Sequence, residues 1–263
     1  MDLNLIGKSA IVCGSTQGIG RASAIELANM GAQVTLVARN GAKLKEVAAT
    51  LPTPAGQQHD FFVADFDHPG QLREAVDQWL ASHPQAVHIL INNTGGPAGG
   101  AAHSADIEEY RTAFNQHLVC NHILVQALLP RMKASGYGRI INVISTSVKQ
   151  PLDGLGVSNT IRGAVANWAK TLANELGSFG ITVNNVLPGA TETERLQSIL
   201  QAKVEKTGIS EAEAANQMLA SIPAKRFARP EEVAFAIAFL ASPSASYING
   251  INLPVDGGRT KSL

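Results

Sequence analysis

The sequence predicts an α/β protein built around a doubly wound parallel sheet. Short apolar segments rich in β-branched residues alternate with amphipathic segments of helical length along the whole chain. Several apolar segments show no alternation of polar and apolar residues, which is typical of parallel strands covered by helices on both faces. A glycine-rich stretch from Gly14 to Gly20 directly follows the first apolar segment. In a doubly wound sheet, such a stretch typically forms the turn between the first strand and the first helix.

Seven strands are expected, and helices fill the gaps between them. The strand segments are Ser9–Cys13, Gln33–Ala38, Phe61–Ala64, His88–Asn92, Arg139–Ile144, Ile181–Leu187 and Ile251–Val255. Gly31, directly after Met30, indicates the end of a helix. Pro230, followed by two glutamates, indicates the start of another helix.

Two long segments interrupt this regular alternation. The stretch from Glu108 to Lys133 is expected to be one long helix. The stretch from Thr191 to Phe227 has no strand pattern and is expected to form one or two amphipathic helices. No linker, internal repeat or low-complexity segment is apparent, so residues 1–263 are expected to form one domain.

The composition argues against several classes of protein. The chain is 45% hydrophobic and 16% charged, which suits a compact globular domain. Basic and acidic residues both number 21, so no bulk attraction to nucleic acid or membranes is expected. No apolar run approaches the length of a membrane span, and no signal peptide is apparent. Cys13 and Cys120 are expected to be buried thiols without a metal, which indicates a cytoplasmic protein.

The glycine-rich stretch is a candidate site for a dinucleotide. It consists of Gly14, Ser15, Thr16, Gln17, Gly18, Ile19 and Gly20. Glycines permit a tight turn and a close approach of the backbone, so amide groups at the helix N-terminus can bind a diphosphate. Glycine-rich turns often have a purely structural use. The position between a first strand and a first helix, however, makes this turn a strong indication of dinucleotide binding.

Several motifs together resemble those of the short-chain dehydrogenase/reductase family. The glycine-rich stretch resembles the family's Gly-x-x-x-Gly-x-Gly, and Asn92-Asn93-Thr94-Gly95 resembles its Asn-Asn-Ala-Gly motif. Gly138-Arg139-Ile140 and Asp256-Gly257-Gly258 match further family marks. The resemblance covers nearly the whole chain and includes 3-oxoacyl-carrier-protein reductases. It implies a Rossmann-type sheet, a nicotinamide cofactor and a small carbonyl or alcohol substrate.

The resemblance also assigns roles to individual residues. Asp65 corresponds to the acid that contacts the adenine, and Asn92 lies in the motif beside the cofactor. Pro188, Gly189 and Thr193 correspond to the turn and the threonine that contact the nicotinamide amide. These residues are therefore expected to bind the cofactor.

The end of the second strand indicates which nicotinamide cofactor binds. Proteins that prefer NAD place a carboxylate there to bind the adenosine ribose, whereas this chain has Ala38 followed by Arg39. A guanidinium group suits the 2′-phosphate of NADP(H), so NADP(H) is expected rather than NAD(H). The alternative is that Arg39 is an ordinary solvated surface charge.

The catalytic residues of the family are mostly replaced. No tyrosine in the chain precedes a lysine by four residues, although the family's chemistry normally depends on a Tyr-x-x-x-Lys pair. The family's serine corresponds to Ser145, its tyrosine to Ser158, its lysine to Arg162 and its helix asparagine to His117. Of these four positions, Ser145 alone keeps the family residue.

These replacements differ in their chemical consequences. Arg162 can still bind ribose hydroxyl groups and place a positive charge near the nicotinamide. Ser158 is shorter and less acidic than tyrosine, and a positioned general acid contributes roughly 10²–10⁴ in rate. His117 titrates near neutrality and is a candidate replacement for the acid. The alternative, which we weigh more heavily, is that His117 is hydrogen-bonded within the core.

Three hypotheses about function follow. The first is an NADP(H)-dependent oxidoreductase with a non-standard site of Ser145, Ser158, Arg162 and His117. The second is a catalytically degenerate relative that binds dinucleotide as a sensor or as a partner subunit. The third keeps the cofactor but acts on a substrate that carries its own acid.

The resemblance further implies a lid and an oligomer. Residues 191–227 correspond to the mobile substrate lid of the family, although a packing arm is the alternative. The family usually forms tetramers through its two central helices, here Ile107–Lys133 and Ser158–Gly177. A homotetramer, or a homodimer, is therefore expected.

Overall fold

The computed structural model describes residues 1–262, and its centre is a parallel sheet of seven strands. The strands are β1 (Ser9–Cys13), β2 (Gln33–Ala38), β3 (Asp60–Val63), β4 (Ile89–Asn92), β5 (Gly138–Val143), β6 (Ile181–Pro188) and β7 (Asn252–Val255). Their order in the sheet is β3-β2-β1-β4-β5-β6-β7. The predicted fold class is therefore confirmed, and the predicted strand boundaries differ from the observed ones by at most one residue.

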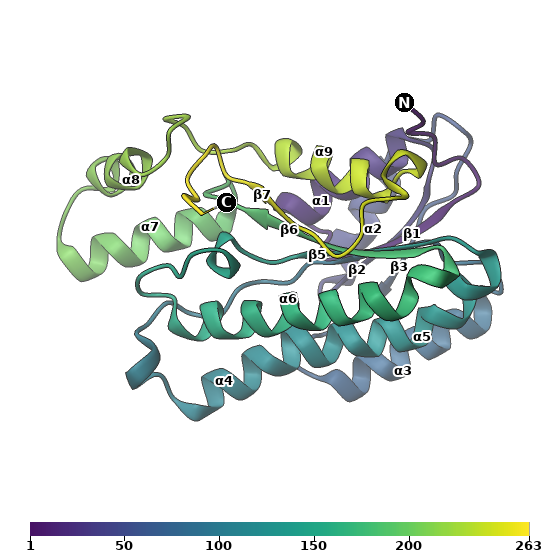
Figure 1. The fold of residues 1–263 in the computed structure, drawn as a ribbon, viewed down its shortest axis with the longest axis horizontal. Coiled ribbons are helices and arrows are strands. Elements are labelled where there is room, and N and C mark those ends of the chain that lie inside the picture. The colour runs from purple at the N-terminus through teal and green to yellow at the C-terminus, as the bar shows by residue number, and fades with distance from the viewer. Residues whose placement is uncertain (263) are drawn as a thin grey trace.

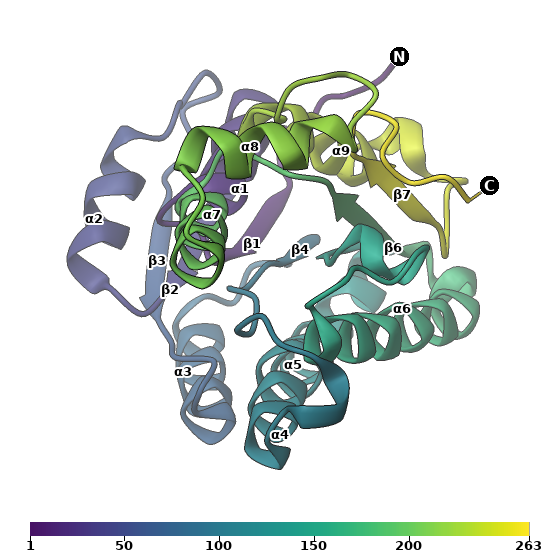
Figure 2. The ribbon, with the colours of Figure 1, turned by 90° about the vertical axis from the view of Figure 1, so that its left-hand side faces the viewer.

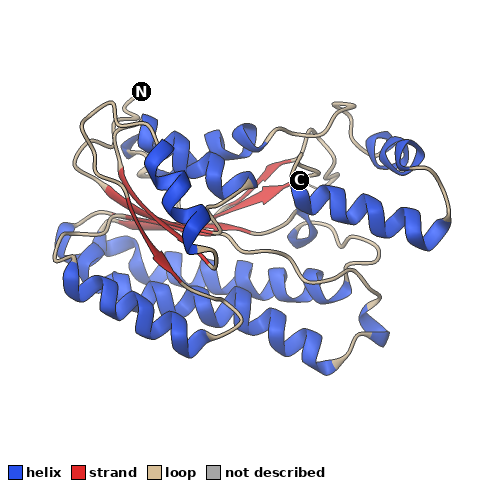
Figure 3. Ribbon diagram, turned by 180° about the vertical axis from the view of Figure 1, so that it is seen from behind, coloured by secondary structure: helices blue, strands red, loops and turns tan. Residues whose placement is uncertain are grey.

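Helices cover both faces of the sheet (Figures 1 and 3). One face carries α1 (Gly18–Asn29), α2 (Gly41–Thr50) and α9 (Pro230–Ala241). The other carries α3 (Pro69–Ser82), α4 (Ile107–Phe114), α5 (Cys120–Ser135) and α6 (Gly156–Leu176). Neighbouring strand residues such as Ile11 and Val12 belong to the two different cores and are both buried. Burial on both faces explains why these strands show no polar alternation in the sequence.

The long helix expected from Glu108 to Lys133 is interrupted. Between α4 and α5 the chain forms a π-helical turn, Asn115–Val119, which contains His117. A π-helical turn adds one residue to a helical turn, and such turns occur frequently at functional sites. The helical prediction is correct on both sides of this turn, but the turn itself was not predicted.

Four asparagines form a ladder of hydrogen bonds across four neighbouring strands. Asn92 donates to Asn142 at 2.8 Å, Asn142 donates to Asn185 at 2.9 Å, and Asn185 donates to Asn252 at 2.8 Å. These residues are direct neighbours in the strand register. Buried amides are stable only when they are hydrogen-bonded, so the ladder fixes the register of β4 to β7.

The segment between β6 and α9 forms two helices, α7 (Glu194–Thr207) and α8 (Glu211–Ala220). Figure 2 shows them at one end of the sheet, near the viewer. The strand order reverses between β1 and β4. In open parallel sheets, ligands bind outside the carboxyl ends of the strands at such a reversal. The fold therefore identifies where to look for a functional site.

Candidate active site

A pocket of about 700 Å³ opens at the carboxyl ends of the strands. It is lined by the segments that follow β1 to β6, by the start of α6 and by the start of α7. Most of the site residues predicted from the sequence line it together. These are Gly14, Thr16, Gln17, Gly18, Ile19, Arg39, Asp65, Ser145, Ser158, Arg162, Pro188, Gly189 and Thr193.

The glycine-rich turn begins α1 and faces this pocket. Gly14 has a φ of +59°, and a Cβ atom on Gly20 would overlap with the carbonyl oxygen of Gly14. Gln17 is the N-cap of α1, and in the described part of the chain its side chain makes no capping hydrogen bond. The first amide groups of α1 therefore remain available for an anion at the positive end of the helix dipole.

Ser15, Gly20 and Asn92 support this turn from outside the pocket lining. The buried Ser15 Oγ accepts a hydrogen bond from the backbone amide of Val37 at 3.1 Å, which ties the turn to β2. Asn92 belongs to the asparagine ladder, and its neighbour Asn93 lines the pocket. Asn93 Nδ2 donates to the carbonyl oxygens of Cys13 and Gly14, at 3.3 Å each.

Two cations lie where the pocket passes the end of β2. Arg39 is largely exposed, and its Nη1 lies 3.6 Å from a carboxylate oxygen of Asp67. Lys43, from the first turn of α2, lines the same part of the pocket and was missed in the sequence. A cation near a helix N-terminus is unfavourable for the helix dipole, and this is the signal that singles out Lys43.

Ser145, Ser158 and Arg162 lie at the opposite end of the pocket from Arg39, after β5 and in α6. Ser145 Oγ accepts a hydrogen bond from the backbone amide of Ser147 at 3.1 Å. Arg162 is buried, and its Nη1 donates to the carbonyl oxygen of Val143 at 3.1 Å. Burial, and then the charge of Arg195, lower the pKa of Arg162 to about 10. Arg162 therefore remains positively charged at neutral pH.

His117 is one side chain away from the pocket. Its Nδ1 shares a hydrogen bond of 2.6 Å with Thr94 Oγ1, and Thr94 lines the pocket. Its Nε2 is buried without a partner in residues 1–262. Burial, and then the charge of Arg162, lower the pKa of His117 to about 2. The imidazole is therefore neutral at physiological pH, which suits positioning of the Thr94 hydroxyl better than proton donation.

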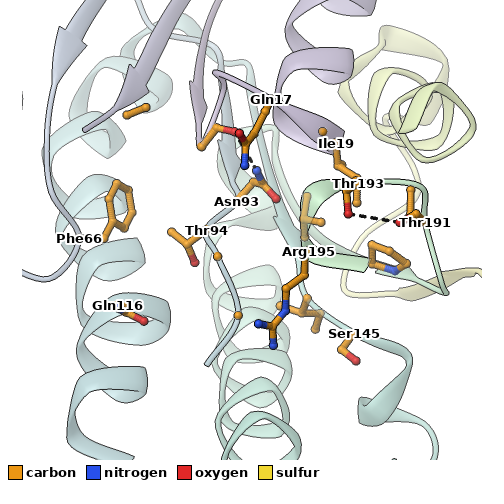
Figure 4. A pocket seen from close by; sticks show the side chains of 18 of the residues that line it. Gln17, Ile19, Phe66, Asn93, Thr94, Gln116, Ser145, Thr191, Thr193 and Arg195 are labelled. Carbon is orange, nitrogen blue, oxygen red and sulfur yellow. Dashed lines mark hydrogen bonds between the residues drawn. The ribbon is translucent and has the colours of Figure 1, made fainter. Parts of the chain in front are cut away.

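Arg195 is the main pocket residue that the sequence did not reveal. It lies in the first turn of α7, and its Nη2 donates to the carbonyl oxygen of Pro97 at 2.6 Å. In Figure 4 its guanidinium group lies between Thr94 and Ser145. Like Lys43, it is a cation at a helix N-terminus, so the same signal was present in the sequence.

Residues outside the pocket add little chemistry. Cys13 and Cys120 are buried and unpaired. Burial raises the pKa of the Cys120 thiol to about 12 and that of Cys13 still further. No group of three metal-ligating side chains occurs within residues 1–262. None of the helices in the same range is long and apolar enough to cross a membrane.

Comparisons with known proteins agree with the fold. Residues 14–260 match a family model described as enoyl-(acyl carrier protein) reductase. The NADPH-dependent reductase BacG of Bacillus subtilis is 30% identical over 256 residues, which cover 97% of this chain and 99% of BacG. The 3-oxoacyl-[acyl-carrier-protein] reductase FabG of Vibrio cholerae is 33% identical over 260 residues, covering 97% and 98% of the two chains.

Solved structures give the same result. The crystal structure of L-sorbose reductase from Gluconobacter frateurii, complexed with NADPH and L-sorbose, superimposes with a TM-score of 0.92 and 31% identity. The match covers 100% of both chains. This chain therefore belongs to the short-chain dehydrogenase/reductase family, as the motifs predicted.

Proposed function

We propose that this protein is an NADP(H)-dependent oxidoreductase that acts on a small carbonyl or alcohol substrate. The observation that carries the proposal is a single pocket that extends from Arg39 and the glycine-rich turn to Ser145, Ser158 and Arg162. Groups suited to a phosphate, a diphosphate and a reacting carbonyl thus share one cavity. BacG, named as NADPH-dependent, and the sorbose reductase crystallised with NADPH support the same cofactor.

The pocket residues divide into those for the cofactor and those for the substrate. The amides of residues 14–19 suit the diphosphate, Asp65 the adenine, and Arg39 with Lys43 the 2′-phosphate. Pro188, Gly189 and Thr193 remain for the nicotinamide side, and Ser145, Ser158 and Arg162 for the substrate. A bound nicotinamide would supply hydride chemistry, which no protein side chain can provide.

The first test concerns Arg39. Replacing Arg39 with aspartate should weaken NADPH binding about 10- to 100-fold, because a charge-assisted hydrogen bond contributes roughly 1.5–3 kcal/mol. NADH lacks the 2′-phosphate, so its affinity should change much less. The affinities are measured by fluorescence titration of the purified protein with each cofactor. Lys45→Glu, at an exposed position on α2 outside the pocket lining, controls for the altered surface charge. Equal losses of both cofactors in Arg39→Asp would contradict the assignment.

The substrate end works without a tyrosine acid. We infer that the Ser145 hydroxyl orients the substrate oxygen, while Arg162 stabilises negative charge that develops on it. Arg162 cannot itself release a proton at working pH. Ser158 lines the pocket where the family has tyrosine, and its small side chain leaves room for a water molecule as the proton source.

The alternative function is dinucleotide binding without turnover, as a sensor or a partner subunit. The observation that favours it is the loss of both the tyrosine and the lysine of the family pair. The two functions differ in one measurement, which is oxidation of bound NADPH in the presence of carbonyl compounds. Tight NADPH binding with no oxidation across neutral and acidic carbonyl compounds would support the alternative, and no binding of either cofactor would contradict both functions.

We also propose that α7 and α8 form the substrate lid and that the protein is a homotetramer. Residues of α7 line the pocket, which supports a covering role.

The proposed oligomer rests on the central helices. The side chains of Ile107 and Phe114 on α4 are exposed, and His122 on α5 contacts Trp168 on α6 edge to face. α4 and α5 follow each other in one helical run, α6 lies beside it, and together they suit the central-helix interface (Figures 1 and 2). Sedimentation velocity should give four subunits, or two; a monomer would contradict this proposal.

A further inference from the structure

Two guanidinium groups of the pocket lack an acidic partner. Arg162 is 7% exposed, and its Nε has no hydrogen-bond partner in residues 1–262. In the same part of the chain, neither Arg162 nor Arg195 forms an ion pair with an aspartate or glutamate. A buried cation without an anion is strongly unfavourable, so Arg162 favours an anionic ligand. Arg195, by contrast, is exposed.

The position of Arg195 indicates which part of the pocket needs the anion. Its guanidinium group lies beside the loop after β4, because a Cβ atom on Gly96 would be 3.5 Å from Nη2. Figure 4 shows the side chain extending from the level of Thr193 toward Ser145, away from Gln17 and Ile19. Thr193 packs against Gly18 of the glycine-rich turn. Arg195 thus points to the substrate end.

The two arginines act on the same region of the pocket. Arg162 Nη1 donates to the carbonyl oxygen of Val143, two residues before Ser145, and Figure 4 shows Arg195 extending toward Ser145. The charge of Arg195 also contributes to the lowered pKa of Arg162. Both line the pocket beside Ser145. Two like charges repel each other, and the second one lies in a helical first turn where cations are disfavoured. A bound anion near both guanidinium groups would offset the burial of Arg162 and the repulsion between the two charges.

We propose that Arg162 and Arg195 together bind a carboxylate of the substrate, so that the protein acts on an oxo acid or on the corresponding hydroxy acid. This inference rests on the proposed function and specifies its substrate class. Planar guanidinium groups match the geometry of a carboxylate better than a lysine does. The replacement of the family lysine by Arg162 then becomes part of substrate recognition. Arg195, on α7, would tie closure of this helix to the presence of the acid.

The diphosphate of the cofactor is a second anion that two arginines are suited to bind. If the arginines served the diphosphate, a small carboxylate would compete with NADPH for them. If they serve the substrate, the carboxylate and NADPH bind together. Whether the carboxylate competes with NADPH or binds together with it therefore distinguishes the two anions.

The test is calorimetric titration of oxalate into the protein saturated with NADPH and, separately, into the free protein. Oxalate should bind in the presence of NADPH, whereas the neutral analogue oxamide should not. Arg195→Gln should weaken oxalate about 10- to 100-fold, as expected for loss of a charged hydrogen-bond donor. The affinity for NADPH should change by no more than about threefold, since the diphosphate is bound elsewhere. Arg111→Gln, on the exposed part of α4, is the matched control.

Three results would overturn this inference. They are competition between oxalate and NADPH, an equal loss of both ligands in Arg195→Gln, and an unchanged oxalate affinity in that variant. Failure of NADPH to bind is a separate result that contradicts the proposed function instead. Since oxalate is titrated with and without NADPH, the two failures are distinguishable. Arg162→Lys, which keeps the charge, provides a second variant and should retain part of the oxalate affinity.

Discussion

Replacing Gly20 with alanine is expected to destabilise the protein by about 3 kcal/mol, because overpacking of backbone against backbone has no easy relaxation. The new methyl group would overlap with the Gly14 carbonyl oxygen and lie 2.7 Å from Asn93 Nδ2. It would therefore push α1 away from the turn that we assign to the diphosphate. The free energy of unfolding is measured by urea denaturation, with and without NADPH.

The same variant should also lose the stabilisation that NADPH gives to the wild-type protein, since a ligand stabilises only the state that binds it. Gly70→Ala is the matched control, because Gly70 is exposed in the first turn of α3 and a Cβ atom there meets nothing within 4 Å. Its stability should stay within about 1 kcal/mol of the wild type. If Gly20→Ala behaved like this control, the close approach of helix and strand would not be essential.

The strands and the cofactor half of the pocket were predictable because their signals are local. Each strand is a short apolar run, and residues 14–20 form a continuous motif at the start of a helix. Parallel strands bring their following turns to one edge of the sheet, so residues from distant segments meet without further information. Arg39, Asp65 and Ser145 line one pocket for this reason.

The substrate half was less predictable because it depends on contacts between distant segments. Arg195 reaches Pro97 across 98 positions of the chain, through a helix whose direction no local pattern sets. His117 could be placed on a helix, but the π-helical turn and the contact with Thr94 follow from packing. The asparagine ladder was hidden for a related reason, since its members become neighbours only once the register of four strands is known.

These distant contacts also change how the replaced catalytic residues are understood. Taken singly, Ser158 and Arg162 look like losses from the family's tyrosine and lysine. Beside Arg195 they define a pocket end with two positive charges and a small polar side chain. Such an end favours an anionic substrate over a neutral one. The replacements therefore suggest a change of substrate class as well as a change of proton source.

The double variant Ser158→Tyr/Arg162→Lys is expected to reduce neutral ketones about 10²- to 10⁴-fold faster than the wild-type protein, because it regains a positioned general acid. The phenol would enter the pocket beside Ser145, where Ser158 now leaves space. Its reduction of oxo acids should gain less, because lysine keeps the charge of Arg162 but loses the planar guanidinium group that we assign to the carboxylate. The measurement is oxidation of NADPH, followed by absorbance, with cyclohexanone and with pyruvate.

Ser158→Phe/Arg162→Lys is the control for the hydroxyl, since it adds the same ring without an acid. Equal rates for the tyrosine and phenylalanine variants would contradict the role of the acid. If the tyrosine variant is active and the wild-type protein is inactive on both substrates, the dinucleotide-binding alternative is favoured.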